Sequence, residues 1–240
     1  DVVSPGEIYT AKAADFDLGS AYFHGNNKTD SDISFGMESG VGYFVVDNIP
    51  ELEAVEKEAA KRGMTQDILL RITPGIDPHT YDKISTGKVD SKFGNAIETG
   101  QAEMITGLAL QKPHVNLCGF HCHVGSQVFE EDVFERAAEV MISFIKKMKE
   151  KFGFITGQLN LGGGYGVKYV DSDAGLDIAL KVKSVGAAIK KACRDMKVDP
   201  PAIMMEPGRS IVADSGMTLY TVGNVKRIPE IGRASCRERV

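Results

Sequence analysis

The sequence predicts an α/β fold in which parallel strands alternate with helices, arranged as a (β/α)8 TIM-type barrel. The strand candidates are continuous apolar runs, which is typical of parallel strands buried on both faces. Amphipathic stretches separate them, and polar residues gather where the strands end. An open doubly wound sheet is the rival arrangement. It is less favoured because no GxGxxG with a following acidic residue at the right distance is present.

Apolar runs rich in β-branched residues predict the strands. Seven segments qualify, at residues 1–4, 21–25, 43–47, 68–72, 116–124, 158–162 and 202–207. A complete barrel has eight strands and eight helices. Because the count is one short and the first run begins at residue 1, we expect the barrel to lack its first βα unit.

Helical patterns fill the intervals between these strands. The clearest lie at residues 49–63, 129–153 and 177–196, and Gly63 is a stop signal for the first. About six helices are expected in all. After residue 216 the pattern changes to alternation, so we expect residues 1–216 to form the partial barrel and residues 217–230 to begin a C-terminal β-domain.

Residues 231–240 have no apolar periodicity. Read back into codons, this tail matches the start of a common sequencing adapter. We therefore expect it to be non-native and exclude it from fold reasoning, as is done for fusion scars.

The bulk composition is that of an ordinary globular protein. The chain has 240 residues, of which 42% are apolar and 25% charged, with a net charge of −5. This balance argues against nucleic-acid or anionic-membrane partners. No apolar run is long enough to span a membrane, and no secretory signal is seen. The four cysteines form no CxxC pair, which favours a cytoplasmic protein with reduced thiols.

The stretch HCHVGSQ at residues 121–127 could suggest a metal site or a thiol nucleophile. Both are disfavoured, because neighbouring strand residues point to opposite faces and Cys122 then turns away from both histidines. His121 and His123 can share a face, but two ligands do not make a metal site. The favoured interpretation is His123 as a flat aromatic group beside a ligand, with Gly125 and Ser126 reaching a phosphate. A core histidine is the alternative.

Two further motifs follow strands. In LNLGGGYG (159–166), the backbone of Gly162, Gly163 and Gly164 can approach an anion, although a tight turn is about as plausible. In EPGRS (206–210), Pro207 and Gly208 fix a turn between Glu206 and Arg209. An arginine suits a phosphate and a carboxylate suits a protonated ring nitrogen, with a surface ion pair as the alternative.

In this order, HVGSQ, LNLGGGYG and EPGRSIVADSG resemble the fold-type III pyridoxal-phosphate decarboxylases, whose barrel is of the alanine-racemase-like type and precedes a β-domain. Within that family, three stretches resemble the diaminopimelate decarboxylases: FHGNNKT (23–29), LLRITPGIDPHT (69–80) and ISTGKVDSKFG (84–94). The resemblance extends from residue 1 to about residue 228. No single motif is specific, but the ordered set is.

The resemblance implies pyridoxal 5'-phosphate as the cofactor and assigns roles to matching residues. It implies that His123 stacks on the pyridine ring and that Glu206 pairs with the ring nitrogen, which makes these two the expected catalytic residues. It places Arg209 on both the phosphate and the substrate, and it gives His24 and Lys28 no sharp role. The whole implied cofactor pocket comprises Asp1, Arg71, His123, Ser126, Gly162, Gly163, Gly164 (the foremost glycine), Glu206, Pro207, Gly208 and Arg209.

The chain departs from the family pattern in two places. The family holds its cofactor covalently through a lysine on the first barrel strand, in a motif like Y-A-x-K-A, and that strand is not seen here. YTAKAAD (9–15) is only superficially similar, because Lys12 falls in a helical stretch. A Cys-Glu-Ser-Gly motif, supplied across the family's dimer, is also not seen. We therefore expect this chain alone to be poorly soluble and to lack useful decarboxylase activity.

For the parent protein, the resemblance implies a carboxy-lyase that converts meso-2,6-diaminopimelate to L-lysine, the last step of lysine biosynthesis. It implies a cytoplasmic homodimer with active sites at the interface and a small amino-acid substrate. Two alternatives stay open. One is a related decarboxylase of arginine, ornithine or carboxynorspermidine, and the other is a non-catalytic pyridoxal-phosphate-binding barrel.

Overall fold

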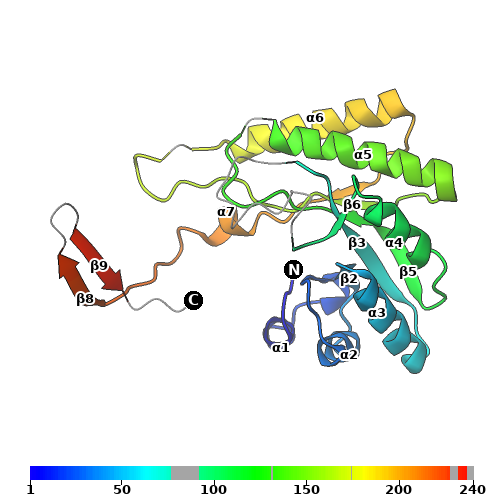
Figure 1. The fold of residues 1–240 in the computed structure, drawn as a ribbon, viewed down its shortest axis with the longest axis horizontal. Helices are drawn as coiled ribbons and strands as arrows, with labels where there is room; N and C mark the ends of the chain where they lie inside the picture. The colour runs from blue at the N-terminus through cyan, green and yellow to red at the C-terminus, as the bar shows by residue number, and fades with distance from the viewer. Residues whose placement is uncertain (77–91, 131, 174, 228–231, 237–240) are drawn as a thin grey trace.

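The computed structural model describes residues 1–76, 92–130, 132–173, 175–227 and 232–236. Strands alternate with helices along the chain, as Figure 1 shows. The elements are α1 (Pro5–Ala13), a 3₁₀ turn (Leu18–Ser20), β1 (Tyr22–Phe23), α2 (Asp30–Glu38), β2 (Tyr43–Val46), α3 (Ile49–Arg62), β3 (Gln66–Thr73), β4 (Asn95–Ala96), α4 (Gln101–Ala109), β5 (Val115–His121), α5 (Val133–Phe152), β6 (Gln158–Asn160), α6 (Ile178–Met196), β7 (Ala202–Met204), α7 (Gly208–Val212), β8 (Val222–Arg227) and β9 (Gly232–Cys236).

The main sheet is parallel and its strand order follows the chain. The order is β1-β2-β3-β5-β6-β7, and the short β4 pairs with β3 at one end. Val2 extends the sheet beyond β1 through an isolated parallel bridge to Phe23. A doubly wound sheet reverses its strand order at a switch point, and this sheet does not. The structure therefore confirms the barrel-type α/β fold predicted from the sequence.

The sheet curves, so that strands far apart in its order face each other. Tyr22 at the start of β1 donates a hydrogen bond from its hydroxyl to Gln158 Oε1 on β6, at 3.1 Å. The same hydroxyl lies 3.8 Å from the sulfur of Met204 on β7. Among the described residues, β7 does not pair with β1 or with Val2, so the wall is a partial barrel.

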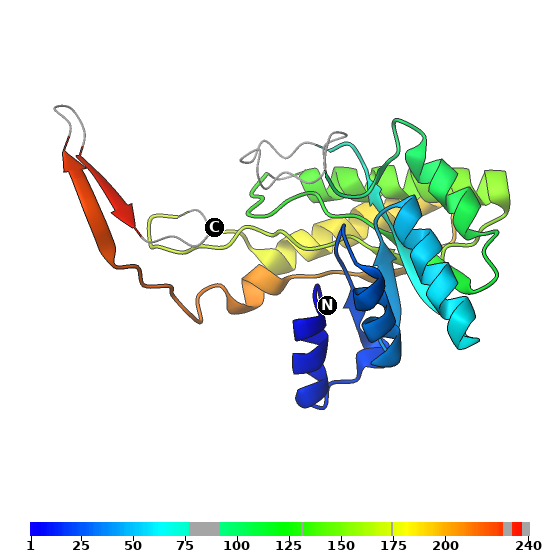
Figure 2. The ribbon, with the colours of Figure 1, turned by 60° about the horizontal axis from the view of Figure 1, so that its bottom comes forward.

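Helices cover the outer face of this wall. α5 and α6 lie side by side along one part of the sheet, as both Figure 1 and Figure 2 show. The inner stripe of α5 is fully apolar and buried, with Phe134, Met141, Ile145 and Met148 among its members. Gly153 ends α5 in the left-handed conformation, at φ 67°, which glycine adopts without strain.

Several element boundaries differ from the sequence predictions; β6 and β7, for example, end two and three residues before their predicted ends. In the first predicted strand only Val2 pairs, because Ser4 instead caps α1 by accepting a hydrogen bond from the Glu7 amide. β5 ends at His121, three residues before the predicted end. The strand β4 and the short helix α7 were not predicted, since neither has enough residues to show a period.

Residues after α7 leave the barrel wall. β8 and β9 pair antiparallel as a hairpin that stands apart from the main sheet in Figure 2. Residues 231–240, which were excluded from the fold prediction, thus contribute β9. Pairing between strands uses backbone hydrogen bonds and does not require an apolar side-chain pattern. That residues 217–230 begin a second domain, and that residues 231–240 are non-native, stay predictions.

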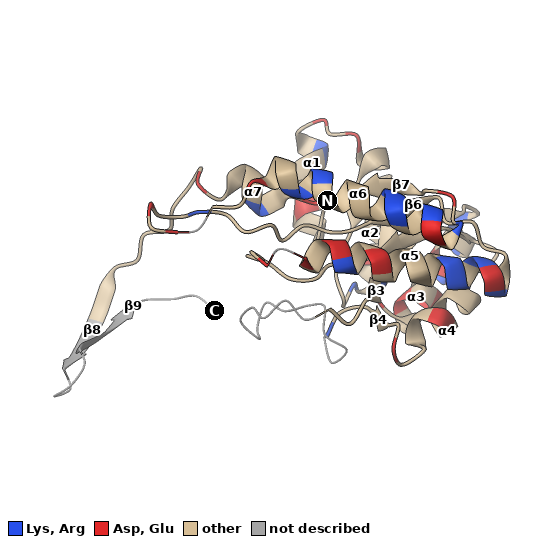
Figure 3. Cartoon of the chain, turned by 90° about the horizontal axis from the view of Figure 1, so that it is seen from above, with Lys and Arg blue, Asp and Glu red and all other residues tan. Residues whose placement is uncertain are grey.

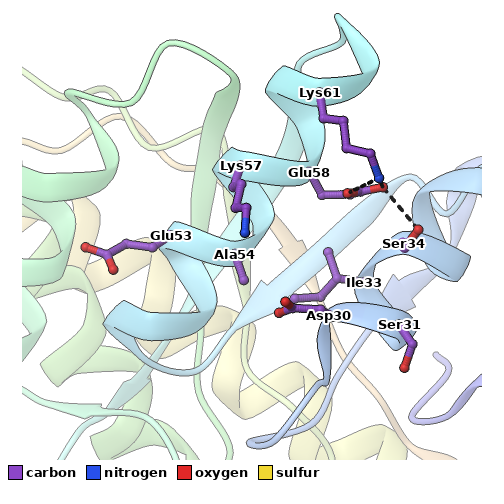
Figure 4. Close-up of a pocket in the computed structure, with 9 residues that line it drawn as sticks. All are labelled: Asp30, Ser31, Ile33, Ser34, Glu53, Ala54, Lys57, Glu58 and Lys61. Atoms are coloured by element: carbon purple, nitrogen blue, oxygen red, sulfur yellow. Dashed lines mark hydrogen bonds and ion pairs between the residues drawn. The ribbon is translucent and has the colours of Figure 1, made fainter.

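The surface carries mixed charge. Figure 3 shows basic and acidic residues interspersed along α5, whereas the charged residues of α6 are mostly lysine and arginine. None of the helices described is both long and apolar enough to cross a membrane. A surface hollow lies between α2 and α3, where Glu58 bridges Lys61 and Ser34 (Figure 4), and it is not part of the strand-end cluster described below.

The start of α2 offers a local stability test. Thr29 Oγ1 accepts a hydrogen bond from the Asp32 amide at 3.2 Å, and Asp32 Oδ2 accepts one from the Thr29 amide at 2.9 Å. Thr29→Ala removes one half of this capping box, so we expect the free energy of unfolding to fall by about 1 kcal/mol. Urea unfolding followed by circular dichroism measures this. An unchanged midpoint would show that water replaces the cap without cost.

Candidate active site

A cluster of polar side chains lies where the strands end. His24 follows β1, His121 ends β5, and Glu206 lies two residues beyond β7. The His24 Nε2 atom is 3.1 Å from Glu206 Oε1, and the His121 Nε2 atom is 3.4 Å from the same oxygen. Asp1 lies at the edge of the cluster, with its Oδ1 3.4 Å from His24 Nε2. The curvature of the sheet therefore gathers side chains from three separate strands around one carboxylate.

Asn160 fixes the position of this carboxylate. It ends β6, and its Nδ2 donates a hydrogen bond to Glu206 Oε1 at 2.7 Å. Its Oδ1 accepts a hydrogen bond from the Gly162 amide at 2.9 Å, and the Glu206 amide donates to the Gly162 carbonyl at 2.9 Å. One asparagine thus ties the glycine loop after β6 to the carboxylate after β7.

The surroundings set the charge of these groups. Burial alone would raise the pKa of Glu206, but the neighbouring His121 and His24 outweigh burial and bring its pKa below the usual value. Burial lowers the pKa of His121 to about 4, and burial lowers the pKa of His123 to about 4 as well. At neutral pH the site therefore holds an ionised Glu206 carboxylate together with the neutral imidazoles of His121 and His123.

A second buried network borders the cluster. Arg71 on β3 is in register with His121 on β5, and its guanidinium lies over the Phe93 ring, 4.3 Å from the centroid. Its Nε is 3.9 Å from Asp47 Oδ1. Asp47 accepts a hydrogen bond from the Gly94 amide at 2.9 Å. The arginine is thus positioned beside the strand-end cluster by residues of two other loops.

Lys28 and Glu51 form a buried ion pair behind the His24 loop. The ammonium lies 2.6 Å from Glu51 Oε1, and both side chains are almost completely buried. Lys28 also donates to the carbonyls of Gly25 at 2.9 Å and Val45 at 2.8 Å. Glu51 in turn accepts from the Asp47 amide at 2.9 Å. Lys28 therefore holds the His24 loop against the end of β2.

The glycine loop packs against the neighbouring strand ends. A Cβ on Gly163 would lie 2.0 Å from the Glu206 carbonyl oxygen, and one on Gly164 would lie 1.9 Å from that of Gly125. The Gly163 amide donates to His123 Nδ1 at 3.3 Å. The amides of Gly162 and Gly163 thus donate within the protein. The third amide of this loop, that of Gly164, has no hydrogen-bond acceptor among the described residues.

A hydroxyl and a guanidinium meet at the other side of the glycine loop. Arg209 on α7 donates from Nε to Ser126 Oγ at 3.0 Å and also contacts the Tyr169 hydroxyl. Ser126 comes from the loop after β5, so two motifs far apart in the sequence lie together. Arg209 is exposed, while Glu206 three residues earlier is mostly buried.

The structure brings most of the residues singled out in the sequence into two neighbouring groups. Asp1 and Glu206 lie in the carboxylate cluster, with Arg71 alongside, whereas Ser126 and Arg209 form the second group. Between them lie His123 and the loop of Gly162, Gly163 and Gly164, while Pro207 and Gly208 begin α7. The Gly208 amide donates to the Glu206 carbonyl at 2.8 Å, so it shapes this turn.

The structure also shows where two residues lie that the sequence analysis rejected as catalytic candidates. Cys122 is completely buried, and burial raises the pKa of its thiol to about 12, which excludes a thiolate nucleophile at neutral pH. Lys12 lies in α1 on the protein surface. The resembling stretch at residues 84–94 lies mostly outside the described residues, as does the end of the one at residues 69–80.

Sequence reasoning missed several members of the site. His121 was weighed as a zinc ligand and as a base for Cys122 and was then given no role, His24 received no sharp role, and Asn160 and Asp47 were not singled out. For His121, the available sequence signal was its spacing of two residues from His123, which places both on one face of a strand. Asn160, two residues before the glycines at a strand end, offered a weaker one.

The chain matches a known family along most of its length. Residues 1–213 match the family described as pyridoxal-dependent decarboxylase, pyridoxal binding domain. A diaminopimelate decarboxylase of Bacillus subtilis (strain 168) is 42% identical over 231 residues, which are 96% of this chain and 53% of that protein. The chain thus spans about half the length of the curated relatives it matches.

Solved structures of similar fold support the same family assignment. The crystal structure of the diaminopimelate decarboxylase from M. jannaschii has a TM-score of 0.79 at 34% identity, covering 99% of this chain and 54% of that one. The enzyme from Helicobacter pylori, complexed with L-lysine, has a TM-score of 0.81 at 27% identity, covering 95% of this chain and 55% of that one. This chain therefore belongs to the pyridoxal-dependent decarboxylases and carries their pyridoxal-binding domain.

Proposed function

We propose that the protein to which this chain belongs removes CO₂ from meso-2,6-diaminopimelate to give L-lysine. The observation that carries this proposal is Glu206, an ionised and mostly buried carboxylate at the carboxyl end of the strands. Asn160 holds it in place at 2.7 Å. The similarity of this chain to a diaminopimelate decarboxylase over 96% of its length supports the choice of substrate.

The cofactor of this domain is pyridoxal 5'-phosphate, and the residues present fit it. Glu206 is suited to accept a hydrogen bond from a protonated ring nitrogen, because its own pKa is held below the usual value. Arg209 and Ser126 offer a cation and a hydroxyl to a phosphate, and the unpartnered amide of Gly164 lies in the neighbouring loop.

We assign the following work to the residues of this chain. The bound cofactor supplies an electron sink for the bond to the departing carboxyl group. Glu206 keeps the proton on the ring nitrogen, and His123, neutral at pH 7, presents a flat ring whose Nδ1 is fixed by the Gly163 amide. Arg209 and Ser126 bind the phosphate, and Arg209 also faces the substrate. Asp1 and Arg71 line the pocket.

We further propose that the parent protein is a cytoplasmic homodimer, as its family resemblance implies. Exposed apolar side chains on α7 and just after it are consistent with further contacts there; they are Ile211, Val212, Met217 and Leu219. Sedimentation equilibrium of the full-length protein tests the dimer, and a monomer at micromolar concentration contradicts it.

Cofactor binding is tested on this chain with pyridoxamine 5'-phosphate, because its amine forms no imine with surface lysines. Glu206→Gln removes a charged hydrogen-bond partner worth about 1.5–3 kcal/mol, so we expect binding to weaken roughly ten- to a hundredfold in equilibrium dialysis. Arg209→Ala should weaken binding of pyridoxamine 5'-phosphate but leave that of pyridoxamine, which has no phosphate, unchanged.

The matched control is Glu103→Gln on α4, whose carboxylate pairs only with surface lysines. This variant should bind the probe as the original chain does. If Glu206→Gln binds equally well, the ring-nitrogen role is wrong. If Arg209→Ala weakens the binding of both probes equally, Arg209 does not bind the phosphate.

The activity itself is tested in a chimera, because the chain spans about half the length of its relatives. Residues 1–213 replace the matching segment of the Bacillus subtilis relative, and CO₂ release is measured with meso-2,6-diaminopimelate, ornithine and arginine. We expect turnover with the first only. A folded chimera that binds the cofactor but prefers ornithine or arginine would overturn the substrate and leave the decarboxylase chemistry standing.

A further inference from the structure

The strand-end cluster has a geometry that cofactor binding alone does not explain. The atoms His24 Nε2, His121 Nε2 and a carboxylate oxygen of Glu206 converge, with all ligand atoms within 4.8 Å of one another. The two closest separations to Glu206 Oε1 are 3.1 Å and 3.4 Å. In a tetrahedral zinc site with bonds of roughly 2.05 Å, ligand atoms lie about 3.3 Å apart. The two nitrogens are thus already spaced from the carboxylate oxygen as ligands of such a tetrahedron are, and all three atoms lie within 4.8 Å of one another.

Hydrogen bonding leaves this cluster incomplete. His24 Nε2 is buried and makes no well-directed hydrogen bond among the described residues, although two carboxylate oxygens lie within 3.4 Å. His24 and His121 are both more than nine-tenths buried. A buried nitrogen that faces two carboxylate oxygens without a well-directed hydrogen bond is costly, and a cation between the nitrogen and the oxygens would remove that cost.

We propose that, when the cofactor is absent, His24, His121 and Glu206 bind a divalent transition metal ion, with Zn²⁺ as the fitting example. Two imidazoles and one carboxylate leave a fourth position open for water or for Asp1 at the rim. Imidazole nitrogens favour zinc, cobalt and nickel over Mg²⁺ and Ca²⁺, which prefer oxygen ligands.

The metal and the cofactor then exclude each other, a step that rests on the proposed role of Glu206. A cation held against the Glu206 carboxylate would repel a protonated ring nitrogen that approaches either oxygen of the same carboxylate. The metal ion therefore delays loading of the empty protein. Neither Cys122, whose thiol is buried and neutral, nor His123, which accepts from the Gly163 amide, is needed as a ligand.

The first test titrates this chain with ZnCl₂ against a chromophoric chelator, and with CoCl₂ to read the visible bands of tetrahedral cobalt. The variant His24→Ala/His121→Ala should bind Zn²⁺ at least about tenfold more weakly, since even losing a supporting group costs that much. His114→Ala, a surface histidine paired with Glu56 at 2.8 Å, is the matched control and should bind as before. Cys118→Ser controls for thiol binding, and MgCl₂ should not bind.

Equal zinc affinity in the original chain and the double-histidine variant overturns the site, as does a loss in Cys118→Ser or His114→Ala instead. Glu206→Gln, which keeps the side-chain shape, guards against a misfolded double variant and should also weaken Zn²⁺ binding. Adding pyridoxamine 5'-phosphate should weaken the apparent zinc affinity. If zinc binds through the histidines but the probe does not compete, the exclusion is overturned. If the probe never binds, the proposed function fails, and the histidine variants still decide the metal site.

Discussion

Gly163→Ala is expected to destabilise the protein by about 3 kcal/mol or more, at the upper end of what overpacking costs. The added Cβ would lie 2.0 Å from the Glu206 carbonyl oxygen and 2.8 Å from its carbon. Both atoms belong to the backbone, so no side chain can turn away to make room. The loop after β7 has to shift, and it carries Glu206 with it. Urea unfolding measures the stability, and binding of pyridoxamine 5'-phosphate should be lost in the same variant.

Gly186→Ala is the matched control. Gly186 lies within α6, and nothing lies within 4 Å of an added Cβ there. Because alanine favours a helix over glycine, this variant should be more stable by roughly 0.5–1 kcal/mol. The same chemical change is thus expected to have opposite signs at the two positions. Equal midpoints for the two variants would show that the loops after β6 and β7 are not in close contact.

Lys28→Met is expected to cost about 3–5 kcal/mol, because it leaves Glu51 buried without its cation. Both side chains are 3% exposed or less, and the ammonium satisfies two backbone carbonyls as well as the carboxylate. The double variant Lys28→Met/Glu51→Gln removes the uncompensated charge and should regain part of the loss. Lys61→Met, at a residue whose surface side chain is 71% exposed, should cost no more than about 1 kcal/mol.

The cost of Lys28→Met should depend on pH. Burial raises the pKa of Glu51, and removing the cation raises that pKa further. The folded variant therefore binds a proton more tightly than the unfolded chain does, so its stability rises as pH falls through the folded pKa. Denaturation at pH 7 and pH 5 measures this difference. A cost that grows toward pH 5 would contradict a buried, unpaired Glu51.

The sequence predicted the architecture well because the signals for buried parallel strands are local. The run predicted at 68–72 lies within β3, and the helix predicted at 177–196 became α6 (Ile178–Met196). Strand order needed one more assumption, that consecutive parallel strands lie side by side, and the sheet follows it. Short elements such as β4 depend on contacts with β3 that no local pattern reports.

The site was predictable only in part. Glu206 and Arg209 stood out because polar residues closing an apolar strand are hard to explain as packing. His24 received no sharp role, because its neighbours in space come from β5 and β7, and only the curvature of the sheet brings them together. The glycines were interpreted as room for an anion, whereas the closest contacts of Gly163 and Gly164 are to backbone carbonyls of Glu206 and Gly125.

The curvature also affects how the protein is made. The contact between Tyr22 and Met204 joins residues 182 positions apart, and His24 meets Glu206 over a similar span. A ribosome therefore has to synthesise nearly the whole barrel before the last carboxylate reaches the histidines that await it. Such distant contacts form late and slowly. Until then the two histidines that are buried in the folded protein lie in an open sheet. The binding site is therefore the final part to assemble.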